Sequence, residues 1–308
     1  MEESIILAVD GGATKTTLTV RTSSGKCLFE KTARGSNYQT IGETEAVTVL
    51  GQLLCDAYIS AKVERIHVAV FAIAGIDTKA DLEAVTHIVK QSLKRAPFII
   101  EELLIENDGH STLLGLVEGK PGALLIAGTG SIAFATDGNG KVVRSGGWGH
   151  RASDQGSGYW IGRQILQAVF KSEDGVLPPT LLKQLAFQQL NIYSIDELVA
   201  WLYQPHYTNA LTASLSPVLN EAIMLGDEQA LVIAQQATQE LSLLVKSSLS
   251  KIEYGVAPFP LYLNGGILQH NSFILERLQE LLRNAYPKIS FNLCSERPIE
   301  YIAKRALL

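Results

Sequence analysis

A glycine turn near the start of the chain constrains the fold more than any other feature of the sequence. The segment Asp10-Gly11-Gly12-Ala13-Thr14-Lys15-Thr16 follows an apolar run at residues 5–9 and leads into a β-prone run at residues 16–20. This pattern predicts two antiparallel strands joined by a hairpin, whose glycines leave backbone N–H groups open to an anion. Taken alone, the turn is more simply explained as an ordinary glycine hairpin, because it matches neither common phosphate-loop pattern.

The polar residues of this turn extend the phosphate-site interpretation. The hydroxyl of Thr14 and the ammonium of Lys15 would add donors to the backbone N–H groups of Gly11 and Gly12. The Asp10 carboxylate could hold a hydrated Mg²⁺, because that cation prefers carboxylate and water oxygens.

Two further apolar runs also end in glycine turns. Residues 123–127 lead into Gly128-Thr129-Gly130-Ser131 and out through a second apolar run, and residues 261–263 lead into Asn264-Gly265-Gly266. The second turn could clamp a triphosphate from the opposite side, and the third suits a nucleoside lying against the backbone. The three turns together predict an enzyme that handles ATP.

Asp108 is the candidate for the centre of the chemistry. It follows a predicted buried strand at residues 103–106 and precedes a helix expected to begin near Ser111. A carboxylate there could accept the proton of a hydroxyl that attacks phosphorus. From spacing alone, Asp108 is more simply explained as the N-cap of this helix than as a base.

The order of motifs along the chain resembles the N-acetylglucosamine and glucosamine kinases, within the BadF/BadG-type ATPases of the sugar kinase, actin and Hsp70 superfamily. The motifs are Asp-Gly-Gly-x-Thr-Lys, Asn-Asp-Gly, Ala-Gly-Thr-Gly-Ser, Ser-Asp-Gln-Gly-Ser-Gly and Asn-Gly-Gly, and residues 146–162 are the most specific stretch. The resemblance implies an α/β fold of two ribonuclease-H-like domains with an interdomain cleft, the second domain being helix-rich. It also implies that Asp108 is the general base.

The resemblance assigns the sugar site to four residues. Asn37, Gly75 and Asp154 match sugar-binding positions of the family, and Asp108 contacts the same sugar. The nearby Trp148 is expected to anchor its loop to the core.

Composition and charge agree with this interpretation. The chain has 308 residues, of which 46% are hydrophobic, and a formal net charge of −5, which argues against a nucleic-acid or anionic-membrane surface. Its three scattered cysteines fit reduced thiols in a cytoplasmic protein, and no apolar stretch is long enough to span a bilayer.

Apolar periodicity predicts two domains. Spacings of three and four indicate helices near residues 47–61 and 231–252, and a buried strand is expected at 66–74, followed by a polar helix at 79–94. The expected N-terminal domain comprises residues 1–117, and the resemblance implies that a C-terminal helix at 295–308 packs on the same domain. The expected C-terminal domain comprises residues 118–294.

The resemblance implies an ATP- and Mg²⁺-dependent kinase, working as a homodimer, that phosphorylates the 6-hydroxyl of N-acetylglucosamine. Glucosamine is the alternative acceptor, because Gln155 stands where many N-acetylglucosamine kinases have Glu. Two further classes of protein share the superfamily fold and stay open beside the kinase. One is a non-catalytic sugar-sensing regulator, and the second is an ATPase that activates a dehydratase.

Overall fold

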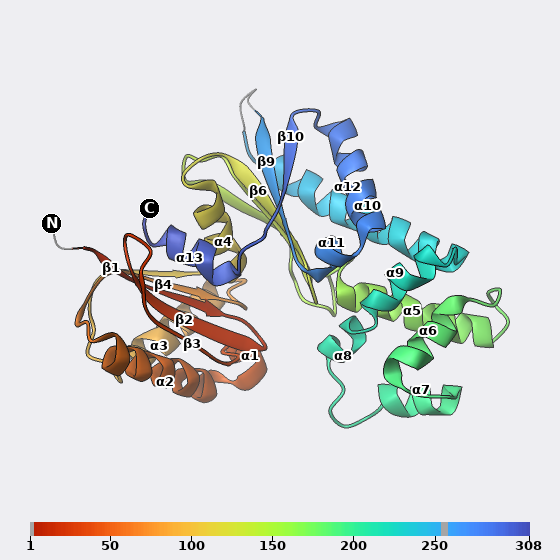
Figure 1. Cartoon of the computed structure of the whole chain (residues 1–308), viewed down its shortest axis with the longest axis horizontal. Helices are drawn as coiled ribbons and strands as arrows, with labels where there is room; N and C mark the ends of the chain where they lie inside the picture. The colour runs from red at the N-terminus through yellow and green to blue at the C-terminus, as the bar shows by residue number, and fades with distance from the viewer. Residues whose placement is uncertain (1–2, 254–257) are drawn as a thin grey trace. The chain divides into compact units, whose positions relative to one another are not determined.

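The computed structural model describes residues 3–253 and 258–308 and divides into two compact units. The N-terminal unit comprises residues 1–120 and 295–308, and the C-terminal unit comprises residues 121–294. Each contains one five-stranded mixed sheet with helices, which confirms the predicted α/β class (Figure 1). We propose that these units are the two domains expected from the sequence.

The N-terminal unit has the strand order β3-β2-β1-β4-β5. The β1, β4 and β5 strands are parallel, whereas β2 and β3 run antiparallel to their neighbours. Its strands are β1 (Ile5–Gly11), β2 (Lys15–Thr22), β3 (Cys27–Arg34), β4 (Arg65–Ile73) and β5 (Ile99–Glu106). Its helices are α1 (Tyr38–Ile41), α2 (Glu43–Ala61), α3 (Lys79–Leu93), α4 (Asp108–Val117) and α13 (Pro298–Arg305).

Both faces of the first sheet are buried, because its central strands send alternate side chains to opposite faces. Leu7 and Val9 of β1 belong to the core shared with α2 and α3. Ile6 and Ala8 belong to the core shared with α13, which lies on the face that also carries α4 (Figure 1). The strand end at Asp10 is therefore fixed by packing on two sides.

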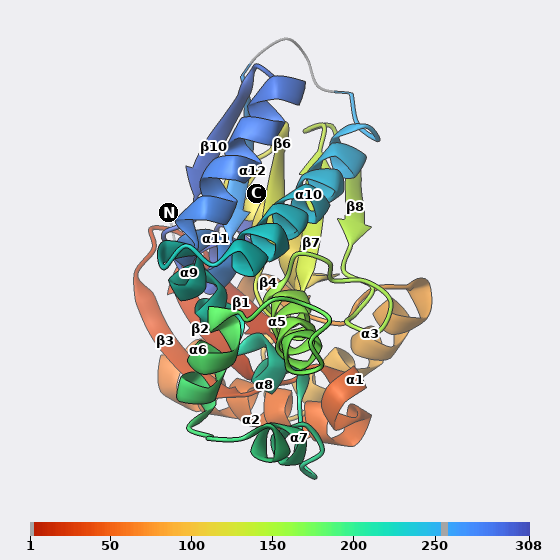
Figure 2. The ribbon, with the colours of Figure 1, turned by 90° about the vertical axis from the view of Figure 1, so that its right-hand side faces the viewer.

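The C-terminal unit has the strand order β10-β9-β6-β7-β8. The strands are β6 (Gly122–Ala127), β7 (Ser131–Thr136), β8 (Val142–Gly146), β9 (Phe259–Asn264) and β10 (Ile289–Leu293). The helices are α5 (Gly158–Glu173), α6 (Leu181–Leu190), α7 (Ile195–Leu202), α8 (Asn209–Ala213), α9 (Ser216–Met224), α10 (Glu228–Leu249), α11 (Gly266–His270) and α12 (Ser272–Ala285). Figure 2 shows α10 and α12, which contact each other, lying across the sheet.

The two sheets have the same topology. In each, an antiparallel meander of three strands is extended by two parallel strands beside its first strand. The glycine turn therefore occupies the same place in both units, between the first and second strands. This repeated arrangement explains why a glycine turn follows the first apolar run of each half of the sequence.

The helices differ from the sequence expectation in several places. Helix α4 begins at Asp108 rather than near Ser111, and α10 ends at Leu249, before Ile252. The short α11 was not expected; it is separate from α12 because the side chain of Asn271 caps the second helix, accepting from the N–H of Ile274 at 3.0 Å.

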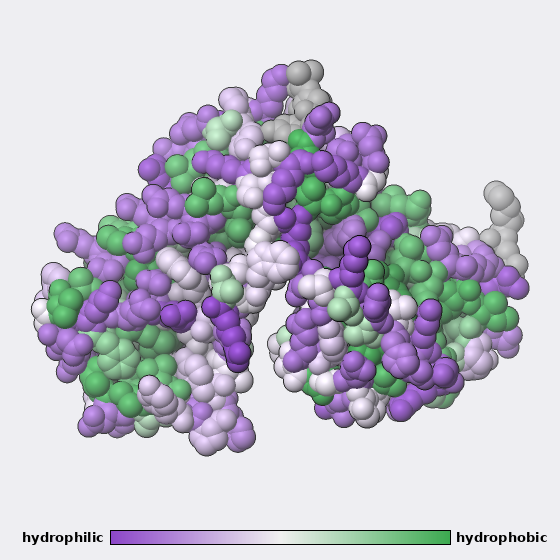
Figure 3. Space-filling view, turned by 180° about the vertical axis from the view of Figure 1, so that it is seen from behind, coloured by the Kyte–Doolittle hydropathy of each residue, from purple (hydrophilic) through white to green (hydrophobic). Residues whose placement is uncertain are grey.

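The surface seen in Figure 3 is a mixture of hydrophilic side chains and separate apolar patches. Within residues 3–253 and 258–308, no helix combines the length and the apolar character needed to cross a membrane.

Candidate functional site

The first glycine turn is held in place by backbone contacts within the N-terminal unit. The N–H of Gly12 donates to the carbonyl of Lys15 at 2.9 Å, and the carbonyl of Gly12 accepts from the N–H of Ser36 at 3.0 Å. A β-carbon at Gly35 would overlap the carbonyl of Ala13, so the loop after β3 lies directly against the turn. Through this contact, the residues next to Asn37 in the sequence lie against the hairpin.

Asn37 and Gly75 lie together, although 38 residues separate them in the sequence. Gly75 has a φ of +88°, and a β-carbon there would stand 2.8 Å from Oδ1 of Asn37. Oδ1 of Asn37 also accepts from the N–H of Gln39 at 3.0 Å and so caps α1. The predicted sugar-binding asparagine therefore has a structural role as well, and only glycine fits beside it.

The carboxylates of Asp10 and Asp108 interact within the N-terminal unit. Asp10 is the penultimate residue of β1, Asp108 stands two residues after the end of β5, and β4 lies between these two strands. Burial, followed by the charge of Asp108, raises the pKa of Asp10 to about 6, while Lys15 opposes this shift. Burial, with the charge of Asp77 as a smaller cause, raises the pKa of Asp108. A more basic carboxylate is a better proton acceptor, which suits the role predicted for Asp108.

The N-cap of α4 is Asn107 rather than Asp108. Oδ1 of Asn107 accepts from the N–H groups of Gly109 and His110 at 3.0 and 3.3 Å. Asp108 stands in the first helical turn, where its Oδ1 accepts from the N–H of Gly109 at 2.9 Å. The simpler explanation, in which Asp108 is only the N-cap of the helix, is therefore wrong.

The second glycine turn rests on the N-terminus of α5. The carbonyls of Gly128 and Thr129 accept from the N–H groups of Gly158 and Tyr159 at 2.8 and 3.1 Å. The turn itself closes through the N–H of Gly128, which donates to the carbonyl of Gly130 at 2.9 Å. A glycine turn beside a helix N-terminus is a suitable environment for phosphate.

Asp154 is buried against this turn. It has a φ of +67°, and its Oδ1 accepts from the N–H of Ser131 at 3.4 Å. A β-carbon at Gly130 would stand 3.1 Å from its Oδ2. Ser157 caps α5 by accepting from the N–H of Trp160 at 3.2 Å, so capping does not require the Asp154 carboxylate.

The third turn joins the second at a pocket of about 630 Å³ in the C-terminal unit. Gly265 has a φ of +102°, and a β-carbon there would overlap the carbonyl of Ala127, so the ends of β9 and β6 are in close contact. Three residues predicted to bind ATP, namely Gly128, Thr129 and Gly266, line this pocket. The structure thus brings together two turns that are more than 130 residues apart.

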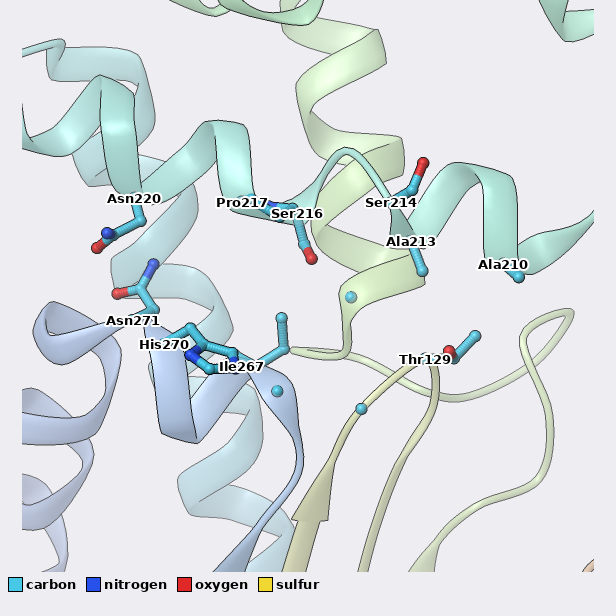
Figure 4. Close-up of a pocket in the computed structure, with 13 residues that line it drawn as sticks. Thr129, Ala210, Ala213, Ser214, Ser216, Pro217, Asn220, Ile267, His270 and Asn271 are labelled. Atoms are coloured by element: carbon cyan, nitrogen blue, oxygen red, sulfur yellow. The ribbon is translucent and has the colours of Figure 1, made fainter. Parts of the chain in front are cut away.

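Most of the remaining walls of this pocket come from residues that the sequence did not point to. Figure 4 shows Asn220, His270 and Asn271 toward one end of the pocket and Thr129 toward the other. The unexpected lining residues of α8, of α9 and of the short connection between them are small or polar and carry no recognisable motif: Ala210, Ala213, Ser214, Ser216, Pro217 and Asn220. Their only sequence signal is the series of small residues around Pro217.

The aromatic residues near Asp154 have different environments. Trp148 is 62% exposed, with the Arg144 guanidinium 4.1 Å from its ring centroid, so the expectation that it anchors the loop to the core is wrong. Nδ1 of His150 accepts a hydrogen bond from Nδ2 of Asn209 at 2.8 Å, so this side chain has a structural role.

Metal binding by Asp10 is consistent with its surroundings. Within the described part of the chain, no three His, Cys, Asp or Glu side chains form a metal-binding group. A buried carboxylate whose pKa is raised by a second carboxylate is nevertheless stabilised by a nearby cation. One carboxylate, completed by water and phosphate oxygens, suits Mg²⁺ better than a site built of protein ligands alone.

We expect Asp10→Asn to stabilise the ligand-free protein at pH 8 and to leave its stability nearly unchanged at pH 3. The pKa of Asp10 rises from 3.8 to about 6 on folding. Between these two pH values Asp10 is ionised in the unfolded chain and still protonated in the folded protein. The free energy of unfolding of the parent protein therefore falls as the pH rises through this range, by at most about 3 kcal/mol. Thermal unfolding of both proteins at the two pH values measures the effect. An equal gain in thermal stability at both pH values would rule out the buried charge as the cause of the stabilisation.

The comparisons with known proteins cover nearly the whole chain. Residues 7–295 match the BadF/BadG/BcrA/BcrD ATPase family. An N-acetyl-D-glucosamine kinase of Dictyostelium discoideum is 31% identical over 93% of this chain and 92% of its own length. An N-acetylmuramic acid/N-acetylglucosamine kinase of Clostridium acetobutylicum is 28% identical over 92% of both chains.

The solved structures extend the likeness to the fold. A candidate N-acetylglucosamine kinase from Chromobacterium violaceum superposes with a TM-score of 0.75 at 22% identity, covering 98% of this chain and 99% of that one. The ROK hexokinase of Thermus thermophilus gives a TM-score of 0.56 at 15% identity, covering 99% and 98%. The fold is therefore that of the two-domain sugar kinases. Because the family match spans both units and includes all three glycine turns, the chain belongs to the BadF/BadG/BcrA/BcrD ATPase family.

Proposed function

We propose that the protein is an amino-sugar kinase that transfers the γ-phosphoryl group of ATP to the 6-hydroxyl of N-acetylglucosamine. The observation that carries this proposal is the joining of two distant glycine turns, through Gly128, Thr129 and Gly266, at one pocket large enough for a nucleoside. The relatives named as N-acetylglucosamine kinases support the choice of acceptor.

The N-terminal unit would supply the base. The Asp108 carboxylate would orient the 6-hydroxyl and accept its proton as the oxygen bonds to phosphorus and the bond to the ADP oxygen breaks. Burial raises the pKa of Asp108, which makes its carboxylate a stronger base. Asn37 and Gly75, which lie together, would contact the sugar, as would Asp154.

The nucleotide would be held by backbone groups and a few side chains. In the N-terminal unit these are Gly11, Gly12, Thr14 and Lys15, of which the last two are exposed. In the C-terminal unit they are Gly128, Thr129, Gly130, Ser131, Gly265 and Gly266. Asp10 would hold Mg²⁺ through water, and the bound cation would neutralise charge on the phosphates.

Glucosamine is the second candidate acceptor. The Asp154-Gln155 pair resembles the form found in bacterial glucosamine kinases, and glucosamine kinase GspK of Vibrio cholerae is 28% identical over 78% of both chains. A free amine at C2 differs from an acetamide by a charge and by the volume of an acetyl group. Steady-state kinetics with both sugars distinguish the two acceptors.

ADP release tests the proposal directly. N-acetylglucosamine, glucosamine, N-acetylmannosamine and glucose are compared at equal ATP. We expect the highest kcat/KM with N-acetylglucosamine. Release that no sugar stimulates would contradict the kinase and favour an ATPase of another function, whereas sugar binding without any ADP release would favour a sensor.

The assembly and compartment complete the proposal. A homodimer and a cytoplasmic location are expected for such a kinase. Sedimentation equilibrium measures the first, because a dimer has twice the chain mass of 33.4 kDa.

A further inference from the structure

The first glycine turn is hydrogen-bonded to both segments of the N-terminal unit that carry candidate sugar residues. The carbonyl of Gly12 accepts from the N–H groups of Ser36 and Asn37 at 3.0 and 3.3 Å. The carbonyl of the preceding glycine accepts from the N–H of Ala74, the residue before Gly75, at 2.7 Å. Two consecutive peptide groups of the turn are therefore held by the segments around the proposed sugar site.

The N–H of Ala13 is open to a ligand, whereas the N–H of Gly12 is not. The Gly12 group donates to the carbonyl of Lys15 at 2.9 Å, within the turn. Ala13 is exposed, and in the described part of the chain no acceptor is hydrogen-bonded to its N–H. Because a peptide group is planar and trans, this N–H points away from the segment that binds the carbonyl of Gly12. Ser36 and Asn37 therefore set the direction of a donor that suits a phosphate oxygen.

A buried pair of hydroxyls holds the same contact. Oγ1 of Thr16, the second residue of β2, donates to Oγ of Ser36 at 2.9 Å, and both residues are at most 1% exposed. The Ser36 hydroxyl lies over Gly11, where a β-carbon would stand 2.7 Å from Oγ. A buried hydroxyl without a partner is costly, so the loss of either hydroxyl would weaken the contact between the turn and residues 35–37.

We propose that Thr16 and Ser36 are positioning residues that couple the binding of the nucleotide to the binding of the sugar. Their hydrogen bond holds the peptide group between Gly12 and Ala13 in the direction that a phosphate oxygen requires. A sugar bound by Asn37 holds residues 35–37 in the same place. Each ligand then favours the contact between this segment and the turn, and so raises the affinity for the other ligand. The inference rests on the proposed function and deepens it.

Calorimetry with N-acetylglucosamine and Mg·AMP-PNP, an ATP analogue that is not hydrolysed, measures this coupling. In the parent protein we expect saturating nucleotide to tighten sugar binding about fivefold or more, and saturating sugar to tighten nucleotide binding by the same factor. Thr16→Val and Ser36→Ala should each bring this coupling factor close to one. Both variants should also weaken nucleotide binding in the absence of sugar, by about fivefold, because the phosphate donor is no longer held.

Thr17→Val is the matched control. The hydroxyl of Thr17 is also buried on β2 and also bonded to a hydroxyl, with 3.0 Å between its Oγ1 and that of Thr32. Successive side chains of a strand point to opposite faces of the sheet, so Thr17 faces away from Ser36. This variant should keep the coupling factor and the nucleotide affinity of the parent. Thr16→Ser, which retains the hydroxyl, should keep both as well.

The double variant Thr16→Val with Ser36→Ala separates coupling from stability. It leaves neither hydroxyl of the pair without a partner, so its unfolding temperature should recover toward that of the parent. Its coupling factor should stay close to one, because the hydrogen bond is still missing. Recovery of the coupling together with the stability would overturn the inference. An unchanged coupling factor in both single variants, or no coupling in a parent that binds both ligands, would also overturn it.

Nucleotide binding keeps the inference separate from the proposed function. If the parent phosphorylates no sugar, the proposed function fails, and the affinities for Mg·AMP-PNP alone decide the inference. Weaker binding in Thr16→Val and Ser36→Ala, but not in Thr17→Val, would support the positioning of the phosphate donor. Equal affinities in the parent and these three variants would overturn it.

Discussion

Asp108→Asn is expected to lower kcat for sugar phosphorylation by about 10²- to 10⁴-fold, the usual contribution of a general base. The substitution keeps the size of the side chain and an oxygen that can accept from the N–H of Gly109, as Oδ1 of Asp108 does at 2.9 Å. It removes the group that would take the proton of the 6-hydroxyl. Sugar binding, measured by calorimetry, should therefore weaken only a few-fold. The fall should be in kcat rather than in KM.

Asp77→Asn is the control for this prediction. Asp77 raises the pKa of Asp108 through its charge, yet it is not placed to contact the reacting atoms in the proposed mechanism. Its removal should shift the acid limb of the pH–kcat profile to lower pH and change the kcat of the plateau less than tenfold. If Asp108→Asn retains more than a tenth of the parent kcat, Asp108 is not the base.

Gly115→Ala is expected to destabilise the protein by about 3 kcal/mol, at the upper end of the usual range for an overpacked contact. Gly115 lies on the face of α4 that meets α13. An added β-carbon there would overlap the carbonyl oxygen of Tyr301, a backbone atom of α13 that cannot move without the helix. Helix α13 buries Ile299 and Ile302 against β1 and β4, so a displacement of this helix would also expose apolar surface. Chemical denaturation measures the loss.

Gly51→Ala in α2 is the matched control. It is also a helical glycine, but the atom that an added β-carbon would meet, at 2.5 Å, is Cδ of the Arg95 side chain, which can rotate away. Alanine also improves helix propensity by about 1 kcal/mol over glycine. We expect Gly51→Ala to be neutral or stabilising. Equal losses in the two variants would show that the backbone contact with α13 is not responsible.

The regular elements could be predicted from the sequence because their signals are local. Apolar runs identified β1 and β4, and spacings of three and four identified α2 and α10. The start of α4 was placed too late because two consecutive polar residues, Asn107 and Asp108, can each cap a helix, and only the backbone decides between them.

The glycine turns that line the candidate nucleotide pocket could be predicted from the sequence, whereas most of its walls could not. The turns at Gly11, Gly128 and Gly265 stand out because each ends an apolar run. The walls that α8 and α9 contribute to the nucleotide pocket have no such signal in the sequence. Ala213 and Ser216 are ordinary residues that the packing of these helices brings to the pocket. The exposure of Trp148 likewise depends on the course of a loop, which sequence periodicity does not describe.

Phosphorus NMR of the reaction products tests the central claim most directly. The parent protein is incubated with Mg·ATP and N-acetylglucosamine, and a parallel sample is followed with Asp108→Asn. We predict that a sugar 6-phosphate resonance grows as ADP forms, with its phosphorus coupled to the two protons at C6, and that the variant gives almost none. Inorganic phosphate appearing in its place, or no change in the ATP resonances, would contradict an amino-sugar kinase.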